Sequence, residues 1–224
     1  MTAIAHNIAR VKQHLPPHVT LIAVSKTRSV EAIMAAYSAG QRDFGESRPQ
    51  ELLQKAAALP QDIRWHFIGH LQRNKVKMVA PCAHLIHSID SAALMREVST
   101  ACEKLGVTAR CLLQVHVAQE ETKFGFLPHE LLDYLRSGEA GALRSVQICG
   151  LMGMASNTGD MEQVRGEFRL IKQLHGQSKA LVSQPDLFTQ ISMGMSGDYA
   201  VAVEEGATLV RIGTMIFGDV GAFS

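Results

Sequence analysis

Short apolar runs recur along the whole chain and alternate with longer stretches in which apolar residues repeat at helical spacing. The runs are nearly continuous rather than alternating, which is typical of strands that are buried on both faces of a sheet. Eight strands are expected on this basis. They are Thr20–Val24, Arg42–Phe44, Trp65–Ile68, Leu85–Ile89, Cys111–Val117, Val146–Leu151, Leu187–Ile191 and Leu209–Ile212.

Helices are expected between these strands, most clearly over 91–105 and over 160–175, where Asp160 can cap the helix and Gly176 can end it. A short helix closed by Gly206 is expected after the seventh strand. Helices between strands force parallel pairing, because parallel neighbours need a crossover connection. Eight such units close into a (β/α)8 barrel, or TIM barrel, which is the predicted fold. A doubly wound open sheet is the alternative that the pattern leaves open.

The 224 residues are expected to form a single domain, 1–224, because no Gly-, Pro- or Ser-rich linker interrupts the alternation of expected strands and helices. Apolar residues make up 46% and charged residues 19%, an ordinary globular composition. The net charge of +1 favours no nucleic-acid partner. No stretch approaches the roughly 20 apolar residues that span a bilayer, so no membrane segment is expected. The four cysteines are scattered, which predicts reduced thiols, no metal site and a cytoplasmic location.

Lys26 lies two residues after the apolar run of the first expected strand, which ends at Val24 and is followed by Ser25. In a (β/α)8 barrel the chemistry gathers at the carboxyl ends of the strands. An amine at the tip of a buried strand is expected to be partly desolvated, which lowers its pKa and makes it a nucleophile that can form a Schiff base with an aldehyde. This segment alone leaves open a lysine that merely reaches solvent.

The ends of the seventh and eighth strands together predict a phosphate site. Ser196 lies between two glycines just before the short helix, where backbone N–H groups can approach an anion. After the eighth strand, Gly213 and Thr214 follow Arg211. Strand one neighbours strand eight in a closed barrel, so the Lys26 amine and the phosphate site come within reach of one ligand. A phosphorylated aldehyde satisfies both, and pyridoxal phosphate (PLP) is the obvious one.

Seven stretches, spread in order over the chain, carry a resemblance to a known family. They are Leu21–Lys26 (LIAVSK), Phe44–Glu51 (FGESRPQE), Trp65–Lys75 (WHFIGHLQRNK), Gln114–Gly125 (QVHVAQEETKFG), Gly150–Met154 (GLMGM), Ser192–Asp198 (SMGMSGD) and Val210–Gly218 (VRIGTMIFG). On these residues the chain resembles the family of pyridoxal phosphate homeostasis proteins, related to the N-terminal barrel of alanine racemase. The resemblance implies that the chain folds into a barrel like the N-terminal domain of alanine racemase and that this barrel binds PLP.

The resemblance also implies roles for individual residues. Lys26 is expected to form the Schiff base, and Arg211 to lie beside the cofactor, at either its ring nitrogen or its phosphate. The other expected cofactor-binding residues hold the phosphate or stand at strand ends. They are Ser47, Met154, Ser192, Ser196, Gly213 and Thr214.

Three positions depart from the family pattern. Ser47 stands where Asn is common, His70 where Pro is common, and His116 where Asn is common. A hydroxyl replaces an amide at Ser47, which puts a ring contact from this loop in question. A functional role for the two histidines stays open.

The chain stops at Ser224, soon after the eighth unit, and no second domain of the kind that supplies the catalytic tyrosine of alanine racemase is expected. A racemase needs acid and base groups on both faces of its substrate, and Lys26 is the one clear candidate. The predicted function is therefore to bind, buffer or deliver PLP as a monomer with little or no turnover, and no catalytic residue is assigned. Expected partners are PLP-dependent apo-enzymes or PLP-synthesising enzymes. The alternatives are a PLP-dependent racemase-like enzyme and a Schiff-base aldolase without the cofactor.

Overall fold

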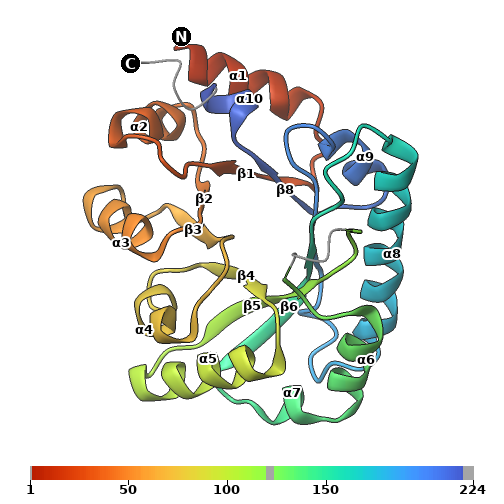
Figure 1. The fold of residues 1–224 in the computed structure, drawn as a ribbon. Coiled ribbons are helices and arrows are strands. Elements are labelled where there is room, and N and C mark those ends of the chain that lie inside the picture. Colours follow the sequence, from red (N-terminus) through yellow and green to blue (C-terminus); the bar gives the residue numbers. More distant parts are fainter. Residues whose placement is uncertain (1, 120–123, 219–224) are drawn as a thin grey trace.

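Eight parallel strands pair in sequence order and close into a barrel, with helices outside it (Figure 1). The structure, a computed structural model, describes residues 2–119 and 124–218. Closure is made by β8 pairing with β1, where Ala23 stands opposite Ile212. The predicted (β/α)8 barrel is confirmed, and the open sheet is excluded. Residues 120–123, within the stretch Gln114–Gly125, lie outside the described residues, as do 219–224.

The strands follow the predicted pattern closely. They are β1 (Thr20–Val24), β2 (Asp43–Glu46), β3 (Arg64–Phe67), β4 (Leu85–Ile89), β5 (Ala109–Val115), β6 (Val146–Gly153), β7 (Gln190–Ser192) and β8 (Leu209–Ile212). β1, β4 and β8 have the predicted bounds. The prediction for β7 is wrong at its start, because Leu187 is exposed and lies in a turn in which its N–H donates to the carbonyl of Gln184 at 3.1 Å.

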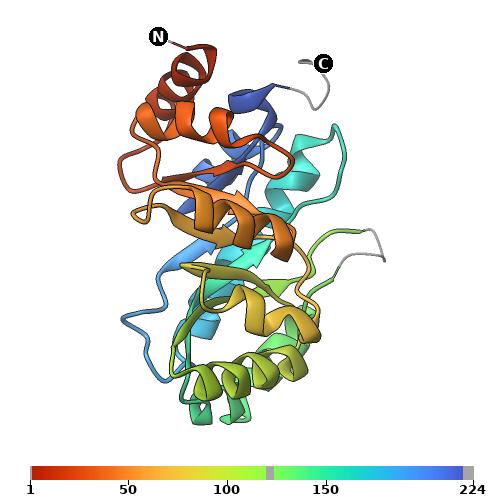
Figure 2. The ribbon, with the colours of Figure 1, turned by 90° about the vertical axis from the view of Figure 1, so that its left-hand side faces the viewer.

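The helices form an outer ring around the strands (Figures 1 and 2). They are α1 (Ala3–Gln13), α2 (Val30–Ser38), α3 (Pro49–Ala58), α4 (Val76–Val79), α5 (Ala92–Leu105), α6 (Pro128–Arg136), α7 (Glu139–Ala142), α8 (Met161–Lys179), α9 (Tyr199–Glu204) and α10 (Thr214–Phe217), with a 3-10 turn at Arg73–Lys75. No helix in the described ranges combines the length and apolarity needed to cross a membrane.

The capping predictions for α8 are half right. Asp160 caps the helix as expected, accepting from the backbone N–H groups of Glu162 and Gln163. Gly176, however, does not end it. The buried face continues past that glycine to Ser178, and the helix runs on to Lys179 because this face still packs on the barrel.

The seam between β8 and β1 is covered by helices from both ends of the chain. α10 is a single turn, and α1 lies beside it (Figure 1). The side-chain amide of Asn7 in α1 donates to the carbonyl of Ile216 in α10 at 3.1 Å. The amino-terminal helix thus completes the outer ring where a full-length eighth helix would stand.

The barrel has two apolar regions, one outside the strands and one inside. The larger core lies between strands and helices and includes Phe44 and Phe67. A smaller cluster fills the inside, where alternate residues of the strands point. Its members are Ile22, Leu85, Leu112, Cys149, Met152 and Leu209. The inside is not wholly apolar, because His87 and Arg211 alternate with Leu85 and Leu209 along their strands and are buried too, as is His66 of β3.

Gly150 is the position at which backbone sterics constrain the barrel most sharply. Its φ is +152°, and a Cβ there would lie 1.8 Å from the carbonyl oxygen of Gln190 in the neighbouring β7. We expect Gly150→Ala to lower the free energy of unfolding by more than about 3 kcal/mol, because β6 and β7 would have to separate. Gly166→Ala is the control: nothing lies within 4 Å of its Cβ position in α8, so alanine should stabilise by about 1 kcal/mol. Urea unfolding measures both, and equal effects would contradict the close approach.

Candidate functional site

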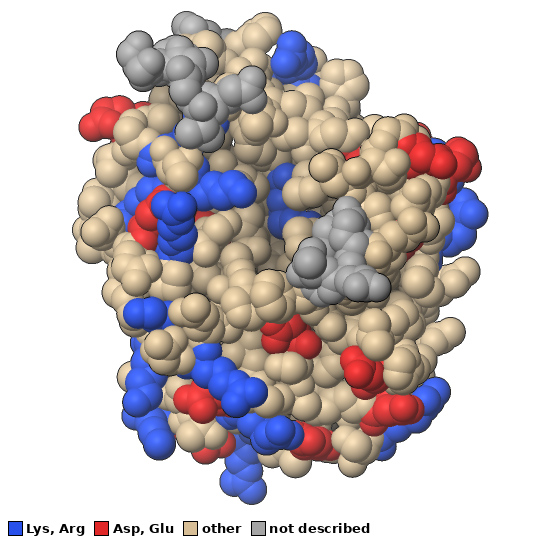
Figure 3. Space-filling model, viewed as in Figure 1, with Lys and Arg blue, Asp and Glu red and all other residues tan. Residues whose placement is uncertain are grey.

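The carboxyl ends of the strands open on one face of the molecule, which is hollowed near its centre with basic side chains at the edge (Figure 3). The closure of β8 onto β1 brings two predicted site segments together there. A Cβ placed on Gly213 would lie 3.4 Å from Val24. Lys26 follows Val24 by two residues, so its Cα lies within about 7 Å of chain from that contact. The predicted amine and the turn after β8 therefore share one rim.

Lys26 itself is exposed, which corrects the expectation of a partly desolvated amine. The residue stands beyond the end of β1, after the buried Ser25, in a turn on the rim rather than within the packed strand. Its side chain thus starts from the surface of the hollow face. The sequence had left open that Lys26 merely reaches solvent, and its exposure agrees with that alternative.

The backbone on the amino-terminal side of Lys26 is held by a buried ion pair. Ser25 donates its hydroxyl to Glu46 at 2.6 Å, and its carbonyl accepts from the Lys55 ammonium at 2.8 Å. Lys55 in turn pairs with Glu46 at 2.8 Å, with both side chains buried. A buried charge pair that also satisfies backbone groups leaves the peptide before Lys26 little freedom.

The backbone on the other side of Lys26 is held by the same group. The N–H of Thr27 donates to Glu51 at 2.8 Å, and Glu51 pairs with Lys55 at 3.0 Å. Thr27 has φ +62°, an uncommon conformation for a β-branched residue. We refer to Glu46, Glu51 and Lys55 as the Lys55 clamp, and we infer that it stabilises this strained turn and so fixes where Lys26 starts.

Within the Lys55 clamp, two opposite effects act on the pKa of Glu46. Burial raises the pKa of Glu46, while the hydrogen bonds from Lys55 and Ser25 oppose that rise. One carboxylate oxygen of Glu46, Oε2, is buried without a hydrogen-bond partner among the described residues. Glu46 therefore depends on Lys55 for its charge compensation.

The loops after β7 and β8 present backbone donors, as predicted for a phosphate site. The N–H groups of Ser196, Gly197 and Thr214 donate to no acceptor in the part of the chain that the structure describes. The loop after β7 is tied to β8, because the N–H of Arg211 donates to the carbonyl of Gly194 at 2.9 Å. The helices that follow have six and four residues, so the free N–H groups matter more here than a helix dipole does.

The conformation of the loop after β7 requires glycine at its start. Gly194 has φ +90°, and a Cβ there would lie 2.5 Å from that of Ala202 in α9. The turn is closed by the N–H of Tyr199, which donates to the carbonyl of Met195 at 2.8 Å. Ser196 is half-buried at its tip. The chain after β7 is thus folded back tightly and exposes its backbone donors at the rim.

Arg211 lies inside the barrel, one layer below the rim, and is 4% exposed. Its guanidinium donates to the hydroxyl of Ser192 at 2.6 Å and to the carbonyl of Gly153 at 3.0 Å. No carboxylate among the described residues forms an ion pair with it. Burial lowers the pKa of Arg211 to about 10, and the charge of Asp198 opposes this, so the group stays cationic at neutral pH. A buried cation without a contacting anion is a strong attractor for an anionic or electron-rich ligand atom.

Two other predicted residues lie at the same end of the barrel. Met154 is half-buried, packs on the inner apolar cluster, and lines a cavity of about 340 Å³ with Met195 and Gly197. Ser47 is half-buried after β2, and its carbonyl would be 2.1 Å from a Cβ on Gly69. The loops after β2 and β3 thus meet at Ser47, with no hydrogen bond from its hydroxyl among the described residues.

The two histidines left open by the sequence have different settings. His70 lies at the rim, pairs with Asp90 at 3.1 Å and stacks on Phe124 with ring centroids 4.0 Å apart. The backbone N–H of His116 donates to the carbonyl of Phe126 at 2.9 Å. His70 links the loops after β3, β4 and β5, so its contacts are explained by a structural role at the rim.

Sequence reasoning missed two groups of residues that support this site. One is the Lys55 clamp, and the other is the set of Asp43, His66 and His87 beneath Arg211. The signal for the second group was present: polar residues stand at alternate, inward positions of otherwise apolar strands. The first group gave no such signal, because Lys55 lies on a helix and meets Glu46 only in the folded barrel.

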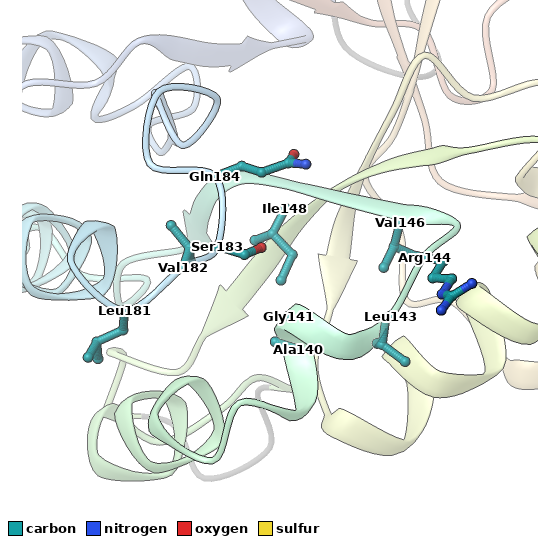
Figure 4. A pocket seen from close by; sticks show the side chains of 10 residues that line it. All are labelled: Ala140, Gly141, Leu143, Arg144, Val146, Ile148, Leu181, Val182, Ser183 and Gln184. Atoms are coloured by element: carbon teal, nitrogen blue, oxygen red, sulfur yellow. The ribbon is translucent and has the colours of Figure 1, made fainter.

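A separate cavity of about 280 Å³ lies at the opposite end of the barrel, where β6 begins (Figure 4). Val146 and Ile148 line it together with Ser183 of the segment that follows α8. It shares no residue with the predicted cofactor site, so it plays no part in the arrangement described above.

Comparison with known proteins agrees with the resemblance seen in the sequence. The family model for the alanine racemase N-terminal domain matches residues 1–220. The pyridoxal phosphate homeostasis protein of Synechocystis is 41% identical over 210 residues, which cover 92% of this chain and 93% of that protein. The human protein of the same name is 35% identical over 223 residues, covering 95% and 81%.

Solved structures give the same picture. PipY of Synechococcus elongatus with PLP bound has a TM-score of 0.86 and 37% identity, covering 96% of this chain and 100% of that one. Alanine racemase of Bartonella henselae, with covalently bound PLP, has a TM-score of 0.74 and 19% identity, covering 98% of this chain and 61% of that one. The second likeness shows the fold alone.

The Lys55 clamp can be tested by removing its cation. We expect Lys55→Met to lower the free energy of unfolding by about 3–5 kcal/mol, because Glu46 would be left buried and unpaired. Arg48→Ala is the control, since Arg48 meets Glu51 at 3.4 Å with its side chain 70% exposed and should cost at most about 1 kcal/mol. The double variant Glu46→Gln, Lys55→Met should recover part of the loss. Urea unfolding of the three variants would contradict this account if Lys55→Met matched the control.

Proposed function

We propose that this chain, which belongs to the alanine racemase N-terminal domain family, binds PLP and takes part in its homeostasis as a binding protein. The family relatives named above are pyridoxal phosphate homeostasis proteins, and PipY has been solved with PLP bound. The observation that carries the proposal is the arrangement of one rim. An exposed lysine on a fixed turn belongs to the same end of the barrel as the backbone donors of two neighbouring loops and a buried arginine, for which residues 2–119 and 124–218 supply no acceptor and no paired carboxylate respectively.

The residues present fit PLP group by group. A phosphate needs several hydrogen-bond donors, which Ser196, Gly197 and Thr214 offer through the backbone. The pyridine nitrogen has a lone pair, which a guanidinium inside the barrel can meet. Of the two roles that the sequence left open for Arg211, its depth favours the ring: it lies inside the barrel, whereas the free N–H groups lie on the rim.

PLP supplies an aldehyde, which condenses with a primary amine to a Schiff base and releases water. We propose that Lys26 provides this amine, held in place by the Lys55 clamp. Ser192 orients Arg211, Met154 forms part of the apolar wall, and Gly213 with Thr214 completes the phosphate site. An unprotonated ring nitrogen beside a permanent cation makes the ring a weak electron sink, which suits retention of the cofactor better than chemistry on an amino acid.

The tyrosines support the view that the chain has little or no turnover. Tyr37 donates its hydroxyl to Asp62 at 2.7 Å on the far end of α2. Tyr134 is buried in α6, where burial raises its pKa to about 12. Tyr199 is half-buried at the start of α9, beneath the loop after β7. The hydroxyls of Tyr37 and Tyr134 are thus engaged or buried away from the rim, and Tyr199 packs against the core, which supports the view that a racemase-like reaction lacks a second proton donor.

The wider setting of this function follows from the same reasoning. We propose that the chain acts as a single domain and as a monomer in the cytoplasm, and that it passes PLP to PLP-dependent apo-enzymes or receives it from PLP-synthesising enzymes. An exposed lysine supports exchange of this kind, because a partner or solvent can reach the amine.

Lys26 is the first residue to test. We expect the wild-type protein mixed with PLP to turn yellow and, after borohydride reduction, to gain the mass of one pyridoxyl phosphate at Lys26. Lys26→Ala should lose both signals, whereas Lys77→Ala, an exposed lysine on α4, should keep them. Absorption and peptide mass spectrometry measure the outcome. A colourless protein that borohydride instead traps on a sugar phosphate would contradict PLP binding and favour the aldolase.

Ser196 tests the phosphate site. Ser196→Ala keeps the backbone N–H and removes only the hydroxyl, which we propose is a further donor to the phosphate; we expect it to weaken PLP binding about tenfold through loss of that one hydrogen bond to a charged group, and to leave the binding of pyridoxal, which has no phosphate, unchanged. Ser183→Ala, in the distant cavity of Figure 4, should alter neither. Spectroscopic titration gives the affinities. If wild-type protein bound pyridoxal as tightly as PLP, the loops after β7 and β8 would not be a phosphate site.

A further inference from the structure

A row of buried polar side chains crosses the inside of the barrel beneath Arg211. His66 Nε2 meets Asp43 at 3.1 Å, and His66 Nδ1 meets His87 Nε2 at 2.9 Å. His87 Nδ1 meets the hydroxyl of Ser192 at 2.8 Å, and that hydroxyl also accepts from Arg211 at 2.6 Å. We call Asp43, His66, His87 and Ser192 the histidine relay. Its members come from β2, β3, β4 and β7, and all four are buried.

The lower end of the relay is an ionised carboxylate. Burial raises the pKa of Asp43, but hydrogen bonds from His66 and Arg64 outweigh this and hold it at about 2. Arg64 reaches both carboxylate oxygens, at 2.8 and 2.5 Å. Asp43 can therefore only accept hydrogen bonds at neutral pH.

The histidines of the relay are neutral. Burial lowers the pKa of His66, and it lowers that of His87 well below the usual value. Cations near the lower end act in the same direction: Arg64 and Arg110 lie close enough to His66 to disfavour a second positive charge. A neutral imidazole has one donor nitrogen and one acceptor nitrogen.

These facts leave one arrangement of hydrogens. His66 must donate from Nε2 to Asp43, so its Nδ1 accepts from Nε2 of His87. The Nδ1 of His87 must then accept from the hydroxyl of Ser192. Ser192 has no hydrogen left to offer, so it presents only lone pairs to Arg211. The hydrogen bonds all run one way, from the guanidinium under the rim to the carboxylate at the other end of the barrel.

We propose that Asp43, His66 and His87 are positioning residues, which fix Ser192 as an acceptor and thereby hold the Arg211 guanidinium in the orientation that meets the cofactor. This rests on the proposed binding of PLP. A carboxylate placed directly on Arg211 would neutralise it and weaken its attraction for the lone pair of the ring nitrogen. The relay instead polarises Ser192 from a distance, because aligned hydrogen bonds in a medium of low dielectric strengthen one another. Arg211 is thus anchored while its charge stays available to the ligand.

The direction of the relay can be measured without any cofactor. We expect the imidazole ¹⁵N shifts of the apo protein at neutral pH to show the Nε2–H tautomer for both His66 and His87. Signals are assigned from the variants His66→Gln and His87→Gln. An Nδ1–H tautomer or a doubly protonated ring at either position would overturn the proposed direction, whatever the protein binds.

The role at the cofactor site needs a second experiment. We expect His87→Phe, which keeps a ring but breaks the relay, to weaken PLP binding about tenfold and to shift the absorption maximum of the bound cofactor. His87→Gln keeps a donor and an acceptor and should restore much of both. Leu85→Met is the matched control, because Leu85 lies inside the same strand and takes no part in the relay; neither property should change.

The outcomes separate the relay from the function on which it rests. If wild-type protein bound no PLP, the proposed function would fall and the tautomer measurement would still decide the direction of the relay. If circular dichroism showed folded His87→Phe that bound PLP with wild-type affinity and absorption, the positioning role would be wrong while PLP binding stood. Should His87→Phe not fold, the smaller His87→Leu takes its place: affinity and absorption equal to those of Leu85→Met overturn the role, and a loss in His87→Leu that His87→Gln largely restores supports it.

Discussion

The pairing of β8 with β1 is the constraint on which the candidate site depends. It sets Ala23 opposite Ile212 and Val24 against Gly213. Without that register, a lysine near the amino terminus and a phosphate-binding turn near the carboxyl terminus would have no reason to meet. Most of the chain lies between these two segments, so bringing them together costs conformational entropy. The pairing of all eight strands offsets that cost, rather than any single contact at the site.

Buried charge is handled in two different ways. The Lys55 clamp, between β2 and α3, pairs opposite charges directly and uses them to hold the backbone around Lys26. Arg211, inside the strands, has neutral oxygens as its contacts and a carboxylate only at the end of a row of imidazoles. Direct ion pairing suits the turn at Lys26, which must keep a fixed conformation. Indirect compensation suits the Arg211 guanidinium, which must still attract a ligand, because an anion in contact with it would neutralise its charge.

The sequence predicted the barrel well because each strand is a local apolar run, and β1, β4 and β8 have the bounds that the pattern indicated. It failed at β7, where Leu187 is apolar yet exposed in a turn. The site was predicted in outline from the strand ends and the family resemblance. The inward polar positions of the histidine relay carried a signal that the sequence reasoning missed, whereas the Lys55 clamp gave none. Each joins residues from different strands or helices, and their roles depend on distances and burial that exist only once the barrel has closed.

The expectation that failed for Lys26 is informative in its own right. The sequence predicted a desolvated amine, whereas Lys26 is exposed and Arg211 is buried. The two ends of the proposed ligand would therefore meet opposite environments. The nitrogen of the pyridine ring would contact the buried guanidinium of Arg211, which is held in a fixed position. The aldehyde carbon, bound to Lys26, would lie near solvent, where a competing amine can attack it. Such a site can hold PLP firmly in orientation and yet release it by exchange at one accessible bond. That combination fits a carrier of the cofactor better than an enzyme that must keep it, because an enzyme loses its activity each time the cofactor leaves.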